Sequence, residues 1–207
     1  MGFTYYIELA GITVFAISGA LAALEQKEHH HDWFSVFFTG FITAIGGGTI
    51  RDVTLGNYPV SWVRDVNVLW AIFVAFLLII LFTKSLLRLR KELFLFDTIG
   101  IGIYTVIGTK ISLAYGVNPF AAIILGMISA IFGGAIRDTL MNQVPFIFRK
   151  EIYATACLAG ALVYVALNYM KIDGNLNTII SALVVVIIRI AAVRYNLSLP
   201  KFSLPKQ

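Results

Sequence analysis

The chain has 207 residues, of which 59% are hydrophobic and 13% charged, and its mean hydropathy is +0.86. In soluble domains about a quarter of all residues are charged, so this composition excludes a soluble globular protein and predicts an integral membrane protein. The formal charge of +5 comes from basic residues that lie beside apolar segments, so it does not indicate nucleic-acid binding.

Apolar segments long enough to cross a bilayer follow one another along the chain. A helix needs about 20 apolar residues to span a hydrocarbon core of about 30 Å. Counting such segments predicts an all-α integral membrane protein with seven transmembrane helices. The predicted spans are Phe3–Leu24, Trp33–Leu55, Val66–Phe82, Leu93–Leu113, Pro119–Leu140, Ile152–Met170 and Asn177–Val193.

The basic residues outside these spans are divided unequally between the two faces of the membrane. Because cytoplasmic loops collect lysine and arginine, the richer face is expected to be cytoplasmic. The amino terminus is then outside and the carboxyl terminus inside, which requires an odd number of crossings and agrees with seven. One set of alternate loops contains Lys27, Lys84, Arg88, Arg90, Lys91, Arg149, Lys150, Arg194, Lys201 and Lys206, and the other contains Arg64 and Lys171.

The second span ends in GGGTIRD, Gly46 to Asp52, which combines three glycines with two charged residues. Interior glycine weakens a helix by about 0.8–1.0 kcal/mol relative to alanine, and charged side chains are costly in lipid. A related segment, GGAIRD, occupies Gly133 to Asp138 in the fifth span, and equivalent residues are 86 positions apart. This constant separation indicates an internal repeat.

The repeat extends over most of the chain. The clearest match pairs GFITAIGGGTIRDVTLGNYPVSWVRD from Gly40 with GMISAIFGGAIRDTLMNQVPFIFRKE from Gly126, and a weaker one pairs ELAGITVFAISG from Glu8 with DTIGIGIYTVIG from Asp97. Each repeat therefore contains three spans. Because three is an odd number, the second repeat enters the membrane from the opposite side, and the two repeats are inverted. We assign residues 1–83 to the first repeat, 93–170 to the second, 177–195 to the seventh transmembrane helix and 196–207 to a cytoplasmic tail.

Inverted repeats with interrupted helices are typical of transport proteins, whose path lies at the repeat interface. We expect Gly46, Gly47 and Gly48 to kink the second span. Gly133 and Gly134 are expected to kink the fifth span in the same way. Carbonyl oxygens released by such kinks could line an ion path. The alternative is close helix packing through small residues, and the path is favoured because both tracts precede Arg-Asp.

The charged residues of the two motifs need partners. Adjacent positions on a helix point about 100° apart, so Arg51 and Asp52 are each expected to have a partner elsewhere. We predict that Glu8, near the outer start of the first span, pairs with Arg51, and that Asp97 pairs with Arg137 in the second repeat. The arginines are expected to act as structural clamps or as pore groups. Asp52 and Asp138 are expected to attract cations in a vestibule. The alternative for both Arg-Asp pairs is that their side chains snorkel to the headgroups. The candidate ion-pair or vestibule residues are Glu8, Arg51, Asp52, Asp97, Arg137 and Asp138.

Two other basic residues lie within predicted spans. Lys110 has no charged counterpart, since Leu21 occupies the equivalent position of the first repeat. Moving one charge through the membrane field is worth about 2.3 kcal/mol per 100 mV, which makes Lys110 a gating candidate. The alternatives are that it obstructs the path or pairs with an acid. Arg189, near the end of the seventh span, is expected to snorkel.

No arrangement of residues indicates an enzyme. Cys157 is the only cysteine and lies inside a span, where it is expected to be a small buried residue. The segment His29–Asp32 contains three histidines, but consecutive residues rarely converge on one metal ion. No nucleophile with a base, zinc-binding spacing or phosphate loop is present. We therefore expect no catalytic residue, no metal and no cofactor.

These motifs resemble those of a known family of membrane proteins. Two inverted three-helix repeats, a seventh helix, and GGGTIRD echoed by GGAIRD are similar to the prokaryotic trimeric intracellular cation (TRIC) channels. The resemblance extends from Glu8 to about Arg194. It implies a homotrimer in the cell membrane of a prokaryote, with a monovalent cation path, mainly for K⁺, inside each protomer between the kinked spans two and five. It also implies that Lys110 matches a lysine linked to gating.

The resemblance also sets the expected partners. K⁺ is the expected permeant ion, membrane lipids are the expected surroundings and a bound lipid is a further candidate, whereas no nucleic acid is expected. Phe132 stands in the second motif where Gly46 stands in the first, so the second kink is expected to be tighter or narrower.

A secondary transporter for a small zwitterion such as glycine is the main alternative, because inverted repeats with broken helices also suit alternating access. The three glycines offer carbonyl oxygens to a cation, whereas a carboxylate ligand is better bound by helix N-termini, so the sequence favours a channel. A third alternative is a lipid-binding or assembly protein without transport, which leaves the matched charges within the membrane unexplained.

Overall fold

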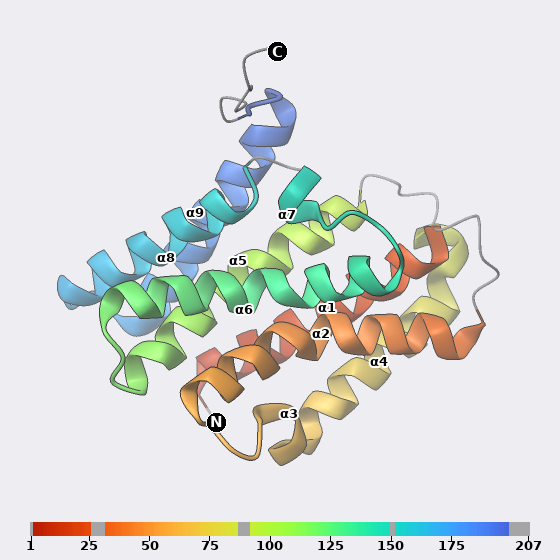
Figure 1. The fold of residues 1–207 in the computed structure, drawn as a ribbon, viewed down its shortest axis with the longest axis horizontal. Coiled ribbons are helices and arrows are strands. Elements are labelled where there is room, and N and C mark those ends of the chain that lie inside the picture. The colour runs from red at the N-terminus through yellow and green to blue at the C-terminus, as the bar shows by residue number, and fades with distance from the viewer. Residues whose placement is uncertain (1, 26–31, 87–91, 150–151, 199–207) are drawn as a thin grey trace, which may run out of the picture.

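The computed structural model describes residues 2–25, 32–86, 92–149 and 152–198. Within these ranges the chain forms nine helices and no strand. They are α1 (Phe3–Glu25), α2 (Trp33–Leu55), α3 (Ser61–Arg64), α4 (Val66–Leu86), α5 (Glu92–Ala114), α6 (Pro119–Leu140), α7 (Phe146–Arg149), α8 (Ala154–Tyr169) and α9 (Gly174–Arg194). Figure 1 shows the long helices crossing one another in an elongated bundle, with α8 and α9 on the opposite side from α3 and α4.

Each predicted span lies on one of the long helices. By length and composition, five described helices could cross a membrane, namely α1, α2, α5 from Phe94 onward, α6 and α9. The apolar parts of α4 (Val66–Phe82) and α8 (Ala154–Tyr169) are shorter. The short helices α3 and α7, which have 4 residues each and follow α2 and α6, were not predicted from the sequence.

Several basic and histidine residues of the predicted loops lie outside the described residues. They belong to the expected first loop and to the other segments assigned to the cytoplasmic face. They are Lys27, His29, His30, His31, Arg88, Arg90, Lys91, Lys150, Lys201 and Lys206.

The local sequence explains where several helices begin and end. The Asp32 carboxylate accepts a hydrogen bond of 2.7 Å from the backbone N–H of Ser35 and so caps the start of α2. Asn118 caps α6 in the same manner, and Pro119 follows it at a position where no helical N–H is needed. Gly56 ends α2 with a φ of 69°, a left-handed conformation that favours glycine.

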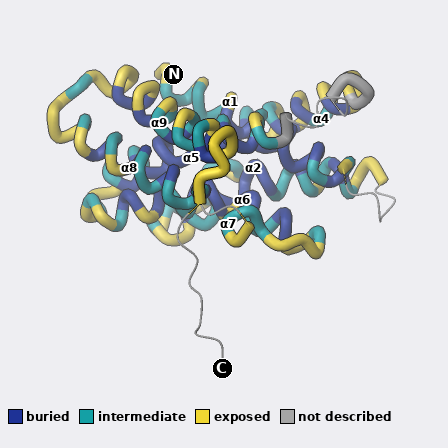
Figure 2. Tube along the Cα trace, turned by 90° about the horizontal axis from the view of Figure 1, so that it is seen from above, coloured by how far each residue is buried: buried dark blue, intermediate teal, exposed yellow. Residues whose placement is uncertain are grey.

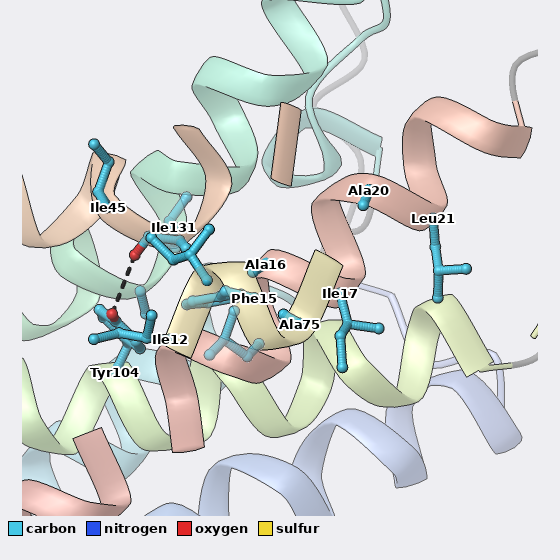
Figure 3. Packing of buried hydrophobic residues seen from close by; sticks show 14 of the residues in the cluster. Ile12, Phe15, Ala16, Ile17, Ala20, Leu21, Ile45, Ala75, Tyr104 and Ile131 are labelled. Carbon is cyan, nitrogen blue, oxygen red and sulfur yellow. Dashed lines mark hydrogen bonds between the residues drawn. The ribbon is translucent and has the colours of Figure 1, made fainter. Parts of the chain in front are cut away.

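The main core lies where α1 packs among α2, α4 and α5. The rings of Phe15 and Tyr104 are 4.9 Å apart between centroids. The Tyr104 hydroxyl donates a hydrogen bond of 3.1 Å to the carbonyl oxygen of Ala44, and this bond joins α5 to α2 (Figure 3). Figure 2 shows the buried residues along the middle of the bundle and the exposed ones on its outside.

Equivalent residues of α1 and α5 make reciprocal contacts. A Cβ added at Gly11 would lie 3.1 Å from the ring of Tyr104, and one added at Gly100 would lie 2.6 Å from the ring of Phe15. Gly11 is equivalent to Gly100 in the sequence repeat, and Phe15 is equivalent to Tyr104. The two helices therefore pack antiparallel, and each ring covers the glycine of the other helix.

The contact between α2 and α6 is reciprocal as well. A Cβ added at Gly47 would overlap the backbone carbonyl oxygen of Ser129, and one added at Gly133 would overlap that of Thr43. Gly47 and Gly133 are equivalent, as are Thr43 and Ser129. Backbones approach this closely only where a side chain is missing, so these two glycines are required by packing.

The predicted interruption of the two helices is wrong. Both α2 and α6 are helical without a break through their glycine tracts. The glycines instead serve the close packing that was the alternative: a Cβ at Gly46 would lie 3.2 Å from the Cα of Gly133, and Gly47 contacts α6 through its backbone. Gly48 and Gly134 have more room, with nearest atoms at 3.9 and 3.6 Å. A kink that keeps the helical hydrogen bonds stays a prediction.

Candidate functional site

Each Arg-Asp motif forms a buried ion pair within itself. Nη2 and Nε of Arg51 donate to Oδ1 of Asp52 at 2.8 and 2.9 Å. Nε of Arg137 donates to Oδ1 of Asp138 at 2.8 Å. The expectation that neighbouring residues point too far apart to pair is wrong, because the long arginine side chain turns back to the next residue. The four side chains are buried, so each charge depends on its partner.

The second oxygen of each aspartate holds the short helix that follows. Oδ2 of Asp52 accepts hydrogen bonds from the backbone N–H and the hydroxyl of Ser61, the first residue of α3, at 2.7 and 2.5 Å. Oδ2 of Asp138 accepts one of 3.0 Å from the backbone N–H of Phe146, the first residue of α7. Because both oxygens of each carboxylate are engaged, this geometry argues against the predicted role in attracting cations.

The predicted ion pairs between helices are absent among the described residues. Glu8 lines the same small cavity as Arg51, but no hydrogen bond or ion pair joins them. Asp97 likewise makes no ion pair with Arg137 and accepts a hydrogen bond of 3.3 Å from the Tyr153 hydroxyl. The physical reason is that each arginine is already neutralised by the aspartate that follows it.

Glu8 faces two adjoining cavities, which we call the Glu8 vestibule. The larger has a volume of about 210 Å³ and is also lined by Tyr5, Arg64 and Asp65. The smaller has a volume of about 20 Å³ and reaches Arg51. The vestibule therefore leads from the start of α1 and the α3–α4 connection towards the glycine tract of α2.

Hydrogen bonds hold the wall of the larger cavity. The Tyr5 hydroxyl donates to Oδ2 of Asp65 at 2.7 Å and accepts from the side-chain nitrogen of Asn67 at 2.8 Å. Asp65 lies between α3 and α4, and the hydrogen bond from Tyr5 lowers the pKa of its carboxyl group. Asp65 therefore keeps its negative charge at neutral pH.

Two buried donors mark the inner end of the vestibule. Nη1 of Arg51 and Nε1 of Trp62 have no hydrogen-bond partner among the described residues, and both residues line the smaller cavity. A buried donor without a partner costs about 1–3 kcal/mol. Glu8 lines the same cavity of about 20 Å³, so this end offers two donors and one carboxyl group to a molecule the size of water.

The equivalent region of the second repeat is closed. Asp97, the equivalent of Glu8, is 2% exposed and lies beneath Tyr153. Arg189 of α9 lies over the Tyr153 ring, 4.7 Å from its centroid, and donates a hydrogen bond of 2.9 Å to the carbonyl oxygen of Ile152. The expectation that Arg189 snorkels is wrong, because it is buried with partners of its own.

Lys110 lies beside the Glu8 vestibule. Its Nζ donates a hydrogen bond of 2.7 Å to the Thr4 hydroxyl and so joins the end of α5 to the start of α1. The next residue, Ile111, lines the larger cavity. The role of Lys110 in gating stays a prediction.

Sequence reasoning missed residues that shape the site. Ser61 and Trp62 lie on α3, and Tyr153 lies between α7 and α8. The long repeat extended past each Arg-Asp motif into the α3 and α7 segments, which was a signal that these segments belong to the site. The position of Tyr153 over Asp97 had no signal in the sequence.

The chain matches a family model described as a glycine transporter over residues 5–84 and 94–169. It is similar to the UPF0126 membrane protein of Vibrio cholerae serotype O1, with 39% identity over 206 residues that cover 98% of this chain and 84% of the relative. It is also similar to the UPF0126 inner membrane protein YadS of Escherichia coli strain K12, with 37% identity over 202 residues that cover 97% of this chain and 96% of the relative.

Solved structures resemble the whole fold. The crystal structure of the TRIC trimeric intracellular cation channel orthologue from Rhodobacter sphaeroides has a TM-score of 0.85 and 34% identity, over 95% of this chain and 100% of that chain. A second structure, described as showing the structural basis for conductance through TRIC cation channels, has a TM-score of 0.83 and 33% identity and covers 100% of both chains.

Proposed function

The chain belongs to the family of the prokaryotic TRIC channels, and from this premise we propose that it conducts monovalent cations, mainly K⁺, across a bacterial membrane. The proposal is supported by similarity over nearly the whole chain to solved structures described as cation channels.

The observation that carries the proposal is the charge of the Glu8 vestibule. The larger cavity is lined by two carboxylates, Glu8 and Asp65, and one guanidinium, Arg64. Arg64 is engaged with Asn57 and the carbonyl oxygen of Pro59, at 2.8 and 2.9 Å. No hydrogen bond or ion pair joins Glu8 to another described residue. With both carboxyl groups ionised the cavity has an excess of one negative charge, and such an excess raises the local concentration of cations.

The proposed membrane arrangement has seven crossings, with α4 and α8 completing two inverted repeats and with the amino terminus outside. The antiparallel packing of α1 against α5 and the reciprocal contacts of α2 with α6 support it, because inverted repeats are expected to meet in this way. The matched ranges of the family model, 5–84 and 94–169, run close to the proposed repeats at 1–83 and 93–170.

The proposed path begins in the Glu8 vestibule and runs beside α2 and α6. A path through the contact surface of these helices is disfavoured, because the backbones touch at Gly47 and Gly133. Gly48 lines the smaller cavity and has space beyond its Cα. We therefore move the predicted path from between the two helices to the side that faces Glu8.

We propose that the assembled protein is a homotrimer in the bacterial cell membrane, with one path in each protomer and lipids around it. The relatives support this, since they are described as trimeric channels and as inner membrane proteins. Large apolar side chains exposed on α4 and α9 suit contact with lipid or with another protomer. Lys110 is proposed to respond to voltage by leaving Thr4.

The second candidate is a secondary transporter of a small zwitterion such as glycine. The description of the matching family model favours it. The acid of the first repeat, Glu8, faces a cavity, whereas the acid of the second repeat, Asp97, is buried. This difference also favours the carrier, since a carrier that exposes its site to one side at a time passes through such a state.

Reconstitution of the purified protein into a planar bilayer with different KCl concentrations on the two sides tests the proposal. A cation channel produces discrete current steps that reverse near the K⁺ equilibrium potential. The selectivity for K⁺ follows from the reversal potential when Na⁺ replaces K⁺ on one side. Saturable glycine counterflow in proteoliposomes, without current steps, would support the carrier and contradict the channel.

A further inference from the structure

The two repeats place equivalent acidic residues in opposite surroundings. Glu8 faces a cavity of about 210 Å³, whereas Asp97 is almost fully buried. The Tyr153 hydroxyl, from the residue directly before α8, donates a hydrogen bond to Asp97, whereas the first repeat has Asn67 at the second position of α4. Asn67 is shorter and bonds to Tyr5 at the cavity wall. A tyrosine directly before α8 therefore accompanies the closed region, and an asparagine within α4 accompanies the open one.

Asp97, Phe146 and Arg189 contact the Tyr153 side chain. Its hydrogen bond to Asp97 is long, at 3.3 Å. The ring also packs near Phe146, with centroids 6.3 Å apart. Arg189 lies over the face of the ring: its guanidinium carbon is 4.7 Å from the Tyr153 ring centroid and 5.0 Å from that of Phe94. A buried guanidinium over an aromatic face is attracted by the π electrons.

Arg189 comes from the part of the chain that lies outside the repeat. It is on α9, which has no equivalent in either repeat, and its hydrogen bond to the Ile152 carbonyl fixes the backbone directly before Tyr153. Its Nε has no partner among the described residues, so the closed arrangement leaves one donor unsatisfied. An arrangement with an unsatisfied donor has a stored cost that opening can recover.

We propose that Tyr153 closes a second vestibule over Asp97, equivalent to the Glu8 vestibule, and that Arg189 of α9 holds it closed. Nη2 of Arg137 also has no hydrogen-bond partner among the described residues. When the Tyr153 ring moves away, this nitrogen and the Asp97 carboxyl group face the opened space. The seventh long helix thereby controls access at the end of the path opposite Glu8. This role rests on the proposed transport function, but the opening itself does not.

The native cysteine reports the opening without any added label site. Cys157 is fully buried on α8, and its backbone N–H donates to the carbonyl oxygen of Tyr153. In the closed arrangement a charged, membrane-impermeant thiol reagent is excluded from Cys157.

The experiment measures the rate at which such a reagent modifies Cys157 in oriented proteoliposomes. Arg189→Gln should raise the rate about tenfold, because losing a desolvated cation–π contact shifts an equilibrium by about that factor. Tyr153→Asn should raise it at least as much, and Tyr153→Phe should raise it less. Modification should occur from one face of the membrane only, the face opposite to that from which a Glu8→Cys, Cys157→Ala variant reacts.

A substitution at the wall of the Glu8 vestibule provides the control. Asn67→Tyr should close the Glu8 vestibule and protect Glu8→Cys while leaving the rate at Cys157 unchanged. Elution as the wild-type oligomer separates opening from unfolding, and Tyr153→Phe preserves the ring if Tyr153→Asn does not fold. If the folded Arg189→Gln and Tyr153 variants leave Cys157 as protected as in the wild type, or if reaction occurs equally from both faces, the proposal is wrong. Changed labelling without any K⁺ current would keep the closure and reject the channel.

Discussion

Replacing Gly47 with alanine tests whether the glycine tract serves packing or bending. The new Cβ would overlap the Ser129 carbonyl oxygen, and because that oxygen belongs to the backbone, no rotamer change relieves the overlap. Gly48 is the neighbouring control, since a Cβ there would lie 3.9 Å from its nearest atoms. The two substitutions alter the flexibility of the helix equally and its packing very differently.

The expected difference is large enough to measure. Adding a methyl group to a packed contact costs about 1–3 kcal/mol, and replacing an interior helical glycine by alanine gains up to about 1 kcal/mol. The helix-propensity gain is common to both variants, so Gly47→Ala should be less stable than Gly48→Ala by the packing cost of about 1–3 kcal/mol, which corresponds to about 2–12 °C in Tm for a chain of this size. Thermal unfolding in detergent, followed by tryptophan fluorescence, measures this difference.

The second repeat offers an independent copy of the test. Gly133→Ala overlaps the Thr43 carbonyl oxygen, whereas a Cβ at Gly134 has its nearest atom at 3.6 Å. The same order of stability is expected. If Gly48→Ala and Gly134→Ala lowered Tm as much as their neighbours did, helix bending would be the main role of the glycines and the packing argument would fail.

Three further changes test the charged residues. Asp52→Asn leaves Arg51 buried without its counter-charge and should lower the free energy of unfolding by about 3–5 kcal/mol. The exposed control Arg64→Gln should lower it by about 0.5 kcal/mol or less, and equal Tm values for the two variants would refute this. Glu8→Gln should reduce K⁺ current more at 0.1 M than at 1 M salt, where the Debye length falls from about 10 Å to about 3 Å, and an equal reduction at both would argue against attraction by charge. Lys110→Met should flatten the voltage dependence of opening, since each charge moved contributes about 2.3 kcal/mol per 100 mV, and an unchanged slope would exclude Lys110 as a sensor.

The long helices and the matched positions could be predicted from the sequence. Apolar length places a helix, and a constant separation of 86 residues is enough by itself to relate Gly47 to Gly133. The same register explains why the contacts between α2 and α6 are reciprocal. Periodicity and repetition are properties of the chain itself, so they persist in the folded protein.

The partners of the charged residues could not be predicted in this way. Whether Arg51 turns back to Asp52 or reaches Glu8 depends on side-chain torsions and on α3, a helix of 4 residues that is too short to leave a periodic signal. The role of the glycines was also undecided, because a tract that weakens a helix in isolation can be kept straight by close packing. The closure over Asp97 arises where the repeat fails, at Tyr153 and α9.

The central claim is that cations enter through the Glu8 vestibule. The most direct test records single-channel K⁺ current from a Glu8→Cys, Cys157→Ala variant before and after a positively charged thiol reagent is added to one side of the bilayer. We expect the reagent to reduce the unitary current sharply when it is added on the side of the amino terminus and to have no effect from the other side. An unchanged unitary current after complete modification of the cysteine would contradict the account.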